Sequence, residues 1–113
     1  MTLESKRFFY ESGSSWEEVW PGITRKVIGY DDRLMLVKVK FIKGAEAPAH
    51  KHPHSQSSYI ESGTFEVVLG GDKKVLNAGD GFFVPPEEIH SVTALEAGIV
   101  VDAFSPHRED FLT

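Results

Sequence analysis

The chain has 113 residues, a formal net charge of −5 and no cysteine, with 41% hydrophobic and 26% charged residues. This length and composition suit one globular domain, expected over residues 1–113, and the lack of cysteine excludes disulfides, thiol nucleophiles and thiolate metal sites. The acidic balance argues against a nucleic-acid partner, and without a long apolar run we expect no membrane partner, no export signal and a cytoplasmic location.

Short β-strands are the predicted elements along most of the chain. The clearest spans residues 33–41, where Lys38 and Lys40 alternate with apolar neighbours, as in a strand with one buried face. Further strands are predicted at residues 25–30, 57–62, 64–69, 73–76, 81–84, 90–94 and 97–104. Such regular spacing is typical of an all-β sandwich or barrel.

Helical signals are confined to two short segments near the ends of the chain. Ser15 followed by Glu18 resembles a capping box, ended by Pro21-Gly22, and residues 105–110 favour a second turn. Neither segment is long enough to form a layer of its own. The expected fold is therefore an all-β barrel with short helical turns near its N- and C-terminal ends.

Three histidines stand at alternate positions in the stretch HKHPHSQ, which begins at His50. Alternation places His50 and His52 on one face, and two imidazoles inside a barrel need hydrogen-bond partners or a metal. Gln56 follows four residues after His52, and His90 lies on a separate predicted strand, so these four side chains could form one site. His54 continues the alternation and could replace Gln56 as the fourth ligand.

Two spacing patterns around these residues resemble the paired motifs of the cupin family. They are Gly44-(5)-His50-x-His52-(3)-Gln56-(6)-Gly63 and Gly79-(5)-Pro85-x-Glu87-(2)-His90-(3)-Ala94. Many cupins have Glu at the position of Gln56, and the family pattern has Gly at Glu87 and Asn at Ala94. The latter two departures fall at turn and packing positions. The resemblance implies a cupin jelly-roll β-barrel in which His50, His52, Gln56 and His90 bind one metal ion.

Neutral ligands set the character of this predicted centre. Three imidazoles and an amide leave the charge of a divalent ion uncompensated, which favours anions and Lewis-acid chemistry. Zn, Ni, Mn and Fe would all suit such ligands. Cupin barrels often dimerise, so we expect a homodimer, with Phe8, Phe9, Trp16 and Trp20 in packing or interface positions.

Asp102 interrupts the apolar run of the last predicted strand. On a period of two it shares a face with Phe104, and a carboxylate facing into a barrel must be paired, hydrogen-bonded or used. Asp102 is therefore a candidate general acid–base; alternatively it pairs with Arg108 or caps the following turn. Arg108 offers a fork suited to a carboxylate, and Phe104 an apolar wall for a sugar ring.

A closer resemblance, over nearly the whole chain, is to the KdgF-type family of small cupins in pectin and alginate breakdown. The segments that carry it are residues 16–22, 34–37, 43–44, 50–54, 70–71 and 102–112. The family often has Glu where this chain has Ser55, a position outside the ligand set.

The KdgF-type resemblance implies a metal-dependent reaction on a small anionic sugar. It would convert 4,5-unsaturated uronate monosaccharides, released by polysaccharide lyases, into linear 5-keto-4-deoxyuronates. Asp102 would be the acid–base, Arg108 the clamp of the sugar carboxylate and Phe104 the wall, with the order of proton transfers open. The alternatives are another metal-dependent cupin enzyme, a dioxygenase or sugar isomerase, and a non-catalytic sugar-binding cupin.

Overall fold

Strands account for most of the described part of the chain, residues 3–112 of the computed structural model. They are β1 (Glu17–Trp20), β2 (Ile23–Tyr30), β3 (Met35–Phe41), β4 (Glu46–His50), β5 (Ser55–Leu69), β6 (Asp72–Asn77), β7 (Gly81–Val84) and β8 (His90–Ser105), followed by the 3-10 turn η1 (Glu109–Leu112). Within residues 3–112, no helix is long and apolar enough to cross a membrane.

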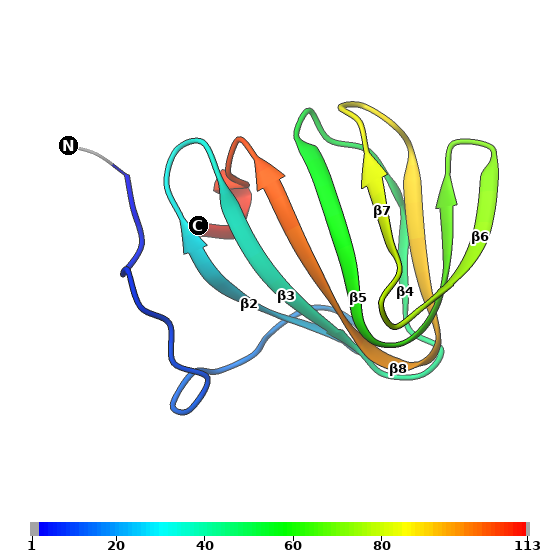
Figure 1. Cartoon of the computed structure of the whole chain (residues 1–113), viewed down its shortest axis with the longest axis horizontal. Coiled ribbons are helices and arrows are strands. Elements are labelled where there is room, and N and C mark those ends of the chain that lie inside the picture. The colour runs from blue at the N-terminus through cyan, green and yellow to red at the C-terminus, as the bar shows by residue number, and fades with distance from the viewer. Residues whose placement is uncertain (1–2, 113) are drawn as a thin grey trace.

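All the strand pairings are antiparallel and follow the order β1–β2–β3–β8–β5–β6, with β4 also paired to β8 and β7 to β5. The long strands β5 and β8 pair with each other along their length and bend together at the lower edge of Figure 1. Each strand thereby passes from one wall of the barrel to the other. The predicted all-β barrel is confirmed.

Two glycines allow the bend of β5 and β8. Gly63 has a φ of 88°, and a Cβ there would lie 2.6 Å from the carbonyl oxygen of Ala97 and 2.7 Å from the Cα of Gly98. The backbones approach too closely for any side chain, and the pairing shifts register around this point. The strands predicted at 57–62 and 64–69 are therefore one continuous, bent strand, β5. Those predicted at 90–94 and 97–104 are likewise one strand, β8.

One local prediction in the N-terminal half was wrong, and one strand was missed. The predicted helical turn that begins at Ser15 is replaced by the strand β1. Glu17 of β1 lies opposite Arg25 of β2 in the sheet, and their side chains form an ion pair. The strand β4 (Glu46–His50), which pairs with the start of β8, was not among the predicted strands. The helical turn near the C-terminus is confirmed, slightly later than expected, at η1.

The barrel interior is filled by apolar side chains in two clusters. The larger cluster of buried residues comprises Ile23, Phe41, Ala45, Ala47, Ile60, Phe65, Val67, Val92, Ala94 and Val100. A smaller cluster of Met35, Val37 and Phe104 packs against Phe111 and Leu112, which fixes η1 over β3 and β8. The short C-terminal turn is thus part of the cavity wall described below, because it is anchored by apolar contacts rather than by its own length.

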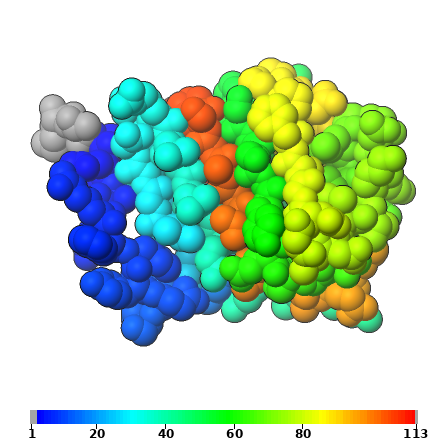
Figure 2. Space-filling model, in the orientation of Figure 1, coloured from blue at the N-terminus to red at the C-terminus, as the bar shows by residue number. Residues whose placement is uncertain are grey.

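The N-terminal segment lies along the outer side of β2, as the blue atoms in Figure 2 show. Its attachment centres on Lys26, a buried lysine whose ammonium group donates to Ser14 Oγ at 2.8 Å and lies 3.3 Å from a carboxylate oxygen of Glu11. The ring of Trp16 lies beneath the ammonium groups of Lys26 and Lys40, at 4.6 and 4.3 Å. Trp16 therefore occupies one of the packing positions expected for it.

Candidate metal centre and adjacent cavity

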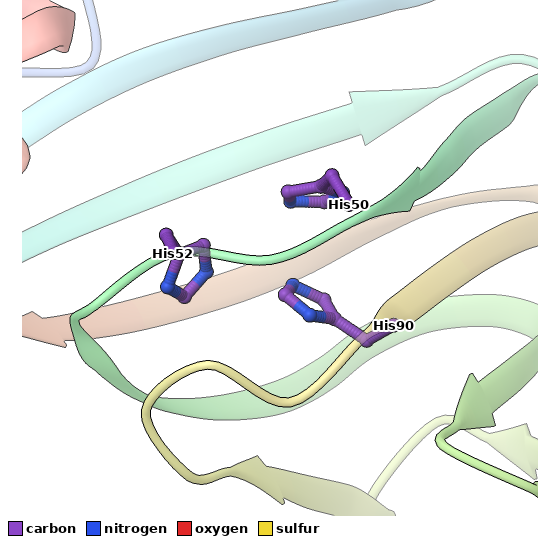
Figure 3. A group of neighbouring side chains, drawn as sticks. All are labelled: His50, His52 and His90. Atoms are coloured by element: carbon purple, nitrogen blue, oxygen red, sulfur yellow. The ribbon is translucent and has the colours of Figure 1, made fainter.

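Three histidine rings meet inside the barrel, as Figure 3 shows. His50 ends β4, His52 follows in the next loop and His90 begins β8. One ring nitrogen from each lies within 4.8 Å of the other two, which is close enough for all three to bind one ion. The antiparallel pairing of His50 with His90 brings the two histidine segments together.

Backbone carbonyls orient each of these rings through its Nδ1 atom. His50 Nδ1 lies 2.9 Å from the carbonyl oxygen of Pro48, and His90 Nδ1 lies 2.9 Å from that of Glu88. His52 Nδ1 lies 3.2 Å from the carbonyl oxygen of His54. A carbonyl can only accept, so each Nδ1 carries the proton and each Nε2 has a free lone pair, the arrangement usual for metal-ligating histidine.

A hydrogen-bond chain fixes the orientation of Gln56 and joins it to Asp102. Gln56 Nε2 donates to Ser58 Oγ at 3.0 Å, and Ser58 Oγ donates to Asp102 Oδ1 at 2.6 Å. The serine proton is used on the carboxylate, so the amide must present its NH₂ group to Ser58. Gln56 Oε1 consequently faces His52 Nε2, at 2.9 Å.

The polar atoms at the centre fit a bound cation. His52 Nε2 and Gln56 Oε1 face each other as two acceptors, and His90 Nε2 is buried without a hydrogen-bond partner. Burial lowers the pKa of His52, and lowers that of His90 to about 4. Both rings are therefore neutral at neutral pH, and their Nε2 lone pairs are available to a metal cation. Neutral imidazoles and an amide oxygen are ligands that a divalent transition metal accepts.

The corner after β7 supports two of the histidines. The backbone N–H of Glu87 donates to the carbonyl oxygen of His52 at 2.8 Å, and the carbonyl of the next residue, Glu88, holds His90. Glu87 has a φ of 69°, a conformation that glycine adopts without cost. The departure from glycine at this motif position therefore leaves local backbone strain beside the candidate metal centre.

His54, the alternative fourth ligand, points away from the three rings that meet. Its Nε2 lies 3.1 Å from the carbonyl oxygen of His107, in the segment before η1. Pro53 separates it from His52, and the chain turns between them instead of continuing the alternation. Among the described residues, the histidine cluster consists of His50, His52 and His90, and the oxygen beside it belongs to Gln56.

A cavity of about 500 Å³ opens beside the histidines. His50, Gln56 and His90 line it together with Asp102, Phe104 and Arg108, so the structure brings the predicted acid–base, wall and clamp to the same chamber. This volume is in the range of small-molecule sites. Trp20, expected in a packing or interface position, also lines the cavity, with its ring 5.9 Å from that of His50.

Asp102 is placed on the inner face of β8, as alternation predicted. Burial raises the pKa of its carboxyl group to about 6, opposed by the hydrogen bond from Ser58 and the charge of Arg108. Such a group exchanges a proton easily near neutral pH. Asp102 accepts from Ser58, whereas Arg108 forms its ion pair with Asp110, through Nε at 3.1 Å and a terminal nitrogen at 3.0 Å.

Sequence reasoning missed several residues of the site, both lining residues and Ser58, which is buried behind the lining and bonds to Gln56 and Asp102. Ser58 lies in an unremarkable polar run, and only its alternation with Gln56 on β5 could have indicated that it faces inward. Arg25 and Glu17 line the cavity from β2 and β1, and Phe111 lines it from η1. The alternation of Arg25 with the buried Ile23 was the available signal for the arginine.

This site and fold define the class of protein. A cupin-domain family model matches residues 37–108, which contain both histidine segments, and the chain belongs to the cupin family. The pectin degradation protein KdgF of Dickeya dadantii (strain 3937) is 45% identical over 109 residues, covering 95% of this chain and 99% of the relative. The KdgF-type resemblance seen in the sequence is confirmed.

Solved structures show the same relationship. KdgF from Halomonas sp. matches with a TM-score of 0.90 and 41% identity, covering 95% of this chain and 99% of the other. An RmlC-like cupin from Shewanella frigidimarina NCIMB 400 matches with a TM-score of 0.94 and 44% identity, covering 96% and 98%.

Proposed function

We propose that the protein catalyses metal-dependent opening of 4,5-unsaturated uronate monosaccharides to linear 5-keto-4-deoxyuronates. The observation that carries the proposal is that one chamber holds a histidine cluster, an arginine and a carboxyl group with a pKa raised to about 6. The full-length similarity to a pectin degradation protein supports a uronate as the substrate class.

His50, His52, His90 and the Gln56 side-chain oxygen would hold the ion. A divalent ion there would supply Lewis-acid stabilisation of negative charge that develops on sugar oxygens. The four side chains are held in place by the protein, because backbone carbonyls orient the three rings and Ser58 orients the amide. A neutral glutamine, unlike glutamate, would leave the positive charge available to an anionic sugar.

Asp102 would move the protons of the reaction. In its ionised form it can accept the proton of the C1 hydroxyl as the C1–O5 bond breaks, which gives an aldehyde at C1 and an enolate at C5. The same carboxyl group can then return a proton to C4, which leaves a ketone at C5. The reaction is an isomerisation with no net gain of atoms. One carboxyl group therefore suffices, because the proton that it takes from the C1 hydroxyl is the proton that it returns to C4.

The arginine and the aromatic wall would orient the sugar. The guanidinium group of Arg108 lies 5.1 Å from the centre of the Phe104 ring, so charge and apolar surface lie side by side. A guanidinium fork suits the sugar carboxylate, while the face of Phe104 suits the sugar ring. Placing the carboxylate near Arg108 would align C1 and C4 with the Asp102 carboxyl group.

Product identification by proton NMR tests this proposal. Metal-loaded protein is mixed with 4,5-unsaturated galacturonate, beside an enzyme-free control because the sugar opens slowly unaided. We expect the C4 vinyl signal to be replaced by a C4 methylene faster than in the control, with no consumption of oxygen. Equal rates with and without protein, or oxygen consumption with saturated sugars, would contradict the proposal.

A further inference from the structure

Two arginines, not one, converge on the same side of the cavity. Arg25 of β2 and Arg108 before η1 both line it, and both guanidinium groups contact the ring of Phe111, at 3.7 and 4.4 Å from its centre. Arg25 is positioned by its pairing with Val39 of β3, in the middle of the sheet.

Each of these arginines is held by a carboxylate at the surface. Glu17 accepts from Arg25 at 2.7 and 3.0 Å, and the fork of Arg108 is filled by Asp110. The arginine side chains are only 15% and 13% exposed, but their acidic partners are 62% and 61% exposed. An exposed carboxylate forms a weak ion pair, so it can be exchanged for another at little cost.

The charges around the cavity favour such an exchange. Among the described residues, four acidic side chains (Glu17, Glu18, Asp102, Asp110) and two arginines line it. An anionic sugar that binds an arginine here must compete with an internal acid, because Glu17 and Asp110 already occupy Arg25 and Arg108. Because Glu17 comes from the edge strand β1, it can turn toward solvent without breaking the barrel.

We propose that Arg25 is a second binding residue for the substrate carboxylate, and that Glu17 occupies its fork until the sugar binds. The inference deepens the proposed function, on which it rests, by assigning carboxylate recognition to an arginine pair. Arg25 and Arg108 would bracket the carboxylate above Phe111, which fixes both its position and its orientation.

Replacing Arg25 tests the assignment. We expect R25Q to raise KM for 4,5-unsaturated galacturonate about 10- to 100-fold, with kcat changed less than about threefold, as for loss of a charge-assisted contact made equally before and during reaction. The matched control R7Q removes the same charge from an exposed arginine outside the cavity and should leave KM unchanged. An unchanged KM in R25Q would overturn the proposal. R25K, which keeps the charge without the fork, should lie between wild type and R25Q.

Glu17→Gln separates an exchangeable partner from a structural ion pair. If Glu17 competes with the substrate, E17Q should lower KM about two- to tenfold, because the fork of Arg25 is then free. If the pair serves only to attach β1, E17Q should leave KM unchanged or raise it, and that result would overturn the exchange. Melting curves of every variant confirm that folded protein is compared.

A binding measurement distinguishes failure of this inference from failure of the proposed function. Saturated galacturonate and neutral galactose are titrated calorimetrically into metal-loaded wild type, R7Q and R25Q. Weaker galacturonate binding in R25Q alone supports the role of Arg25, even if the wild type turns over no unsaturated sugar. Equal galacturonate affinity in wild type and R25Q, or no preference of the wild type for galacturonate over galactose, would overturn it.

Discussion

The histidine wall and the arginine wall of the cavity are held in different ways. On the histidine wall, backbone carbonyls hold His50, His52 and His90, and those carbonyls belong to strands or tight corners. On the arginine wall, the charged groups of Arg25 and Arg108 are held by side chains that are largely exposed to water. The first wall is fixed by the main chain, and the second only by exchangeable ion pairs.

This difference matches what each wall would have to do. A metal site loses affinity when its ligands can rotate, so anchoring each ring through Nδ1 favours a permanent ion. A substrate site must release its ligand in every cycle, and arginines that return to internal carboxylates avoid being left unpaired when the sugar departs.

The largest effect is expected on the histidine wall. His50→Ala removes one ring of the cluster, and we expect loss of stoichiometric metal and of activity by about a thousandfold or more, since Lewis-acid stabilisation is lost. Metal content and turnover are measured on the same preparations. His107→Ala is the control, because His107 lies outside the cluster and its ring Nδ1 bonds to the backbone carbonyl of Asp32. Equal metal loss in both variants would contradict the assignment.

Asp102 lies between the two walls, and its ionisation should lower the free energy of unfolding. Its pKa is raised from 3.8 to about 6, so the native state holds a proton that the unfolded chain has released. The stability of the metal-free protein should therefore fall as the pH rises from about 4 to about 6, and Asp102→Asn should remove that fall. Above pH 6 the variant should be more stable by about 1–3 kcal/mol, measured by urea unfolding. Identical pH profiles for wild type and variant would contradict this account.

Much of the histidine wall could be predicted from the sequence, because ligand spacing in a chain with few histidines is a strong local signal. His50, His52 and His90 were found together as expected. The choice between Gln56 and His54 was open, since it depends on how the chain turns after Pro53, which alternation alone does not decide. The structure places Gln56 beside the rings and His54 against the C-terminal segment.

The arginine wall was predicted only in part. Arg108 stood in a recognisable terminal segment, but Arg25 looked like one of several charged residues on a half-buried strand. Its role depends on the edge strand β1, where the capping-box pattern indicated a helical turn. Cross-strand pairing of Glu17 with Arg25 outweighed that local preference, and a contact between residues eight positions apart leaves no signal in the four-residue capping-box pattern.

Ser58 offers a more moderate test, because it links the walls through Gln56 and Asp102. Ser58→Ala frees the amide to rotate and removes the hydrogen bond that lowers the pKa of Asp102. We expect kcat to fall about tenfold and the acidic limb of its pH profile to move to higher pH. Ser57→Ala, on the exposed face of the same strand, should match wild type. A uniform loss without any pH displacement would indicate only structural damage.

The smallest effect is expected at the strained corner beside the histidine wall. Glu87→Gly relieves a positive φ and should stabilise the protein by about 0.5–1 kcal/mol, with no loss of metal. Glu87→Ala removes the same carboxylate without relieving the backbone, so it should gain nothing. Thermal unfolding of the two variants gives the comparison. Equal stabilities would show that the corner carries no backbone strain.

The most direct test of the central claim is the ultraviolet absorbance of 4,5-unsaturated galacturonate over time. Chelated wild type, the same protein after metal is restored, and metal-loaded Asp102→Asn are run beside an enzyme-free control. We expect fast loss of the conjugated double bond only in the restored wild type, with the other two reduced at least about a hundredfold. Decay at the control rate after metal is restored, or full activity of Asp102→Asn, would contradict it.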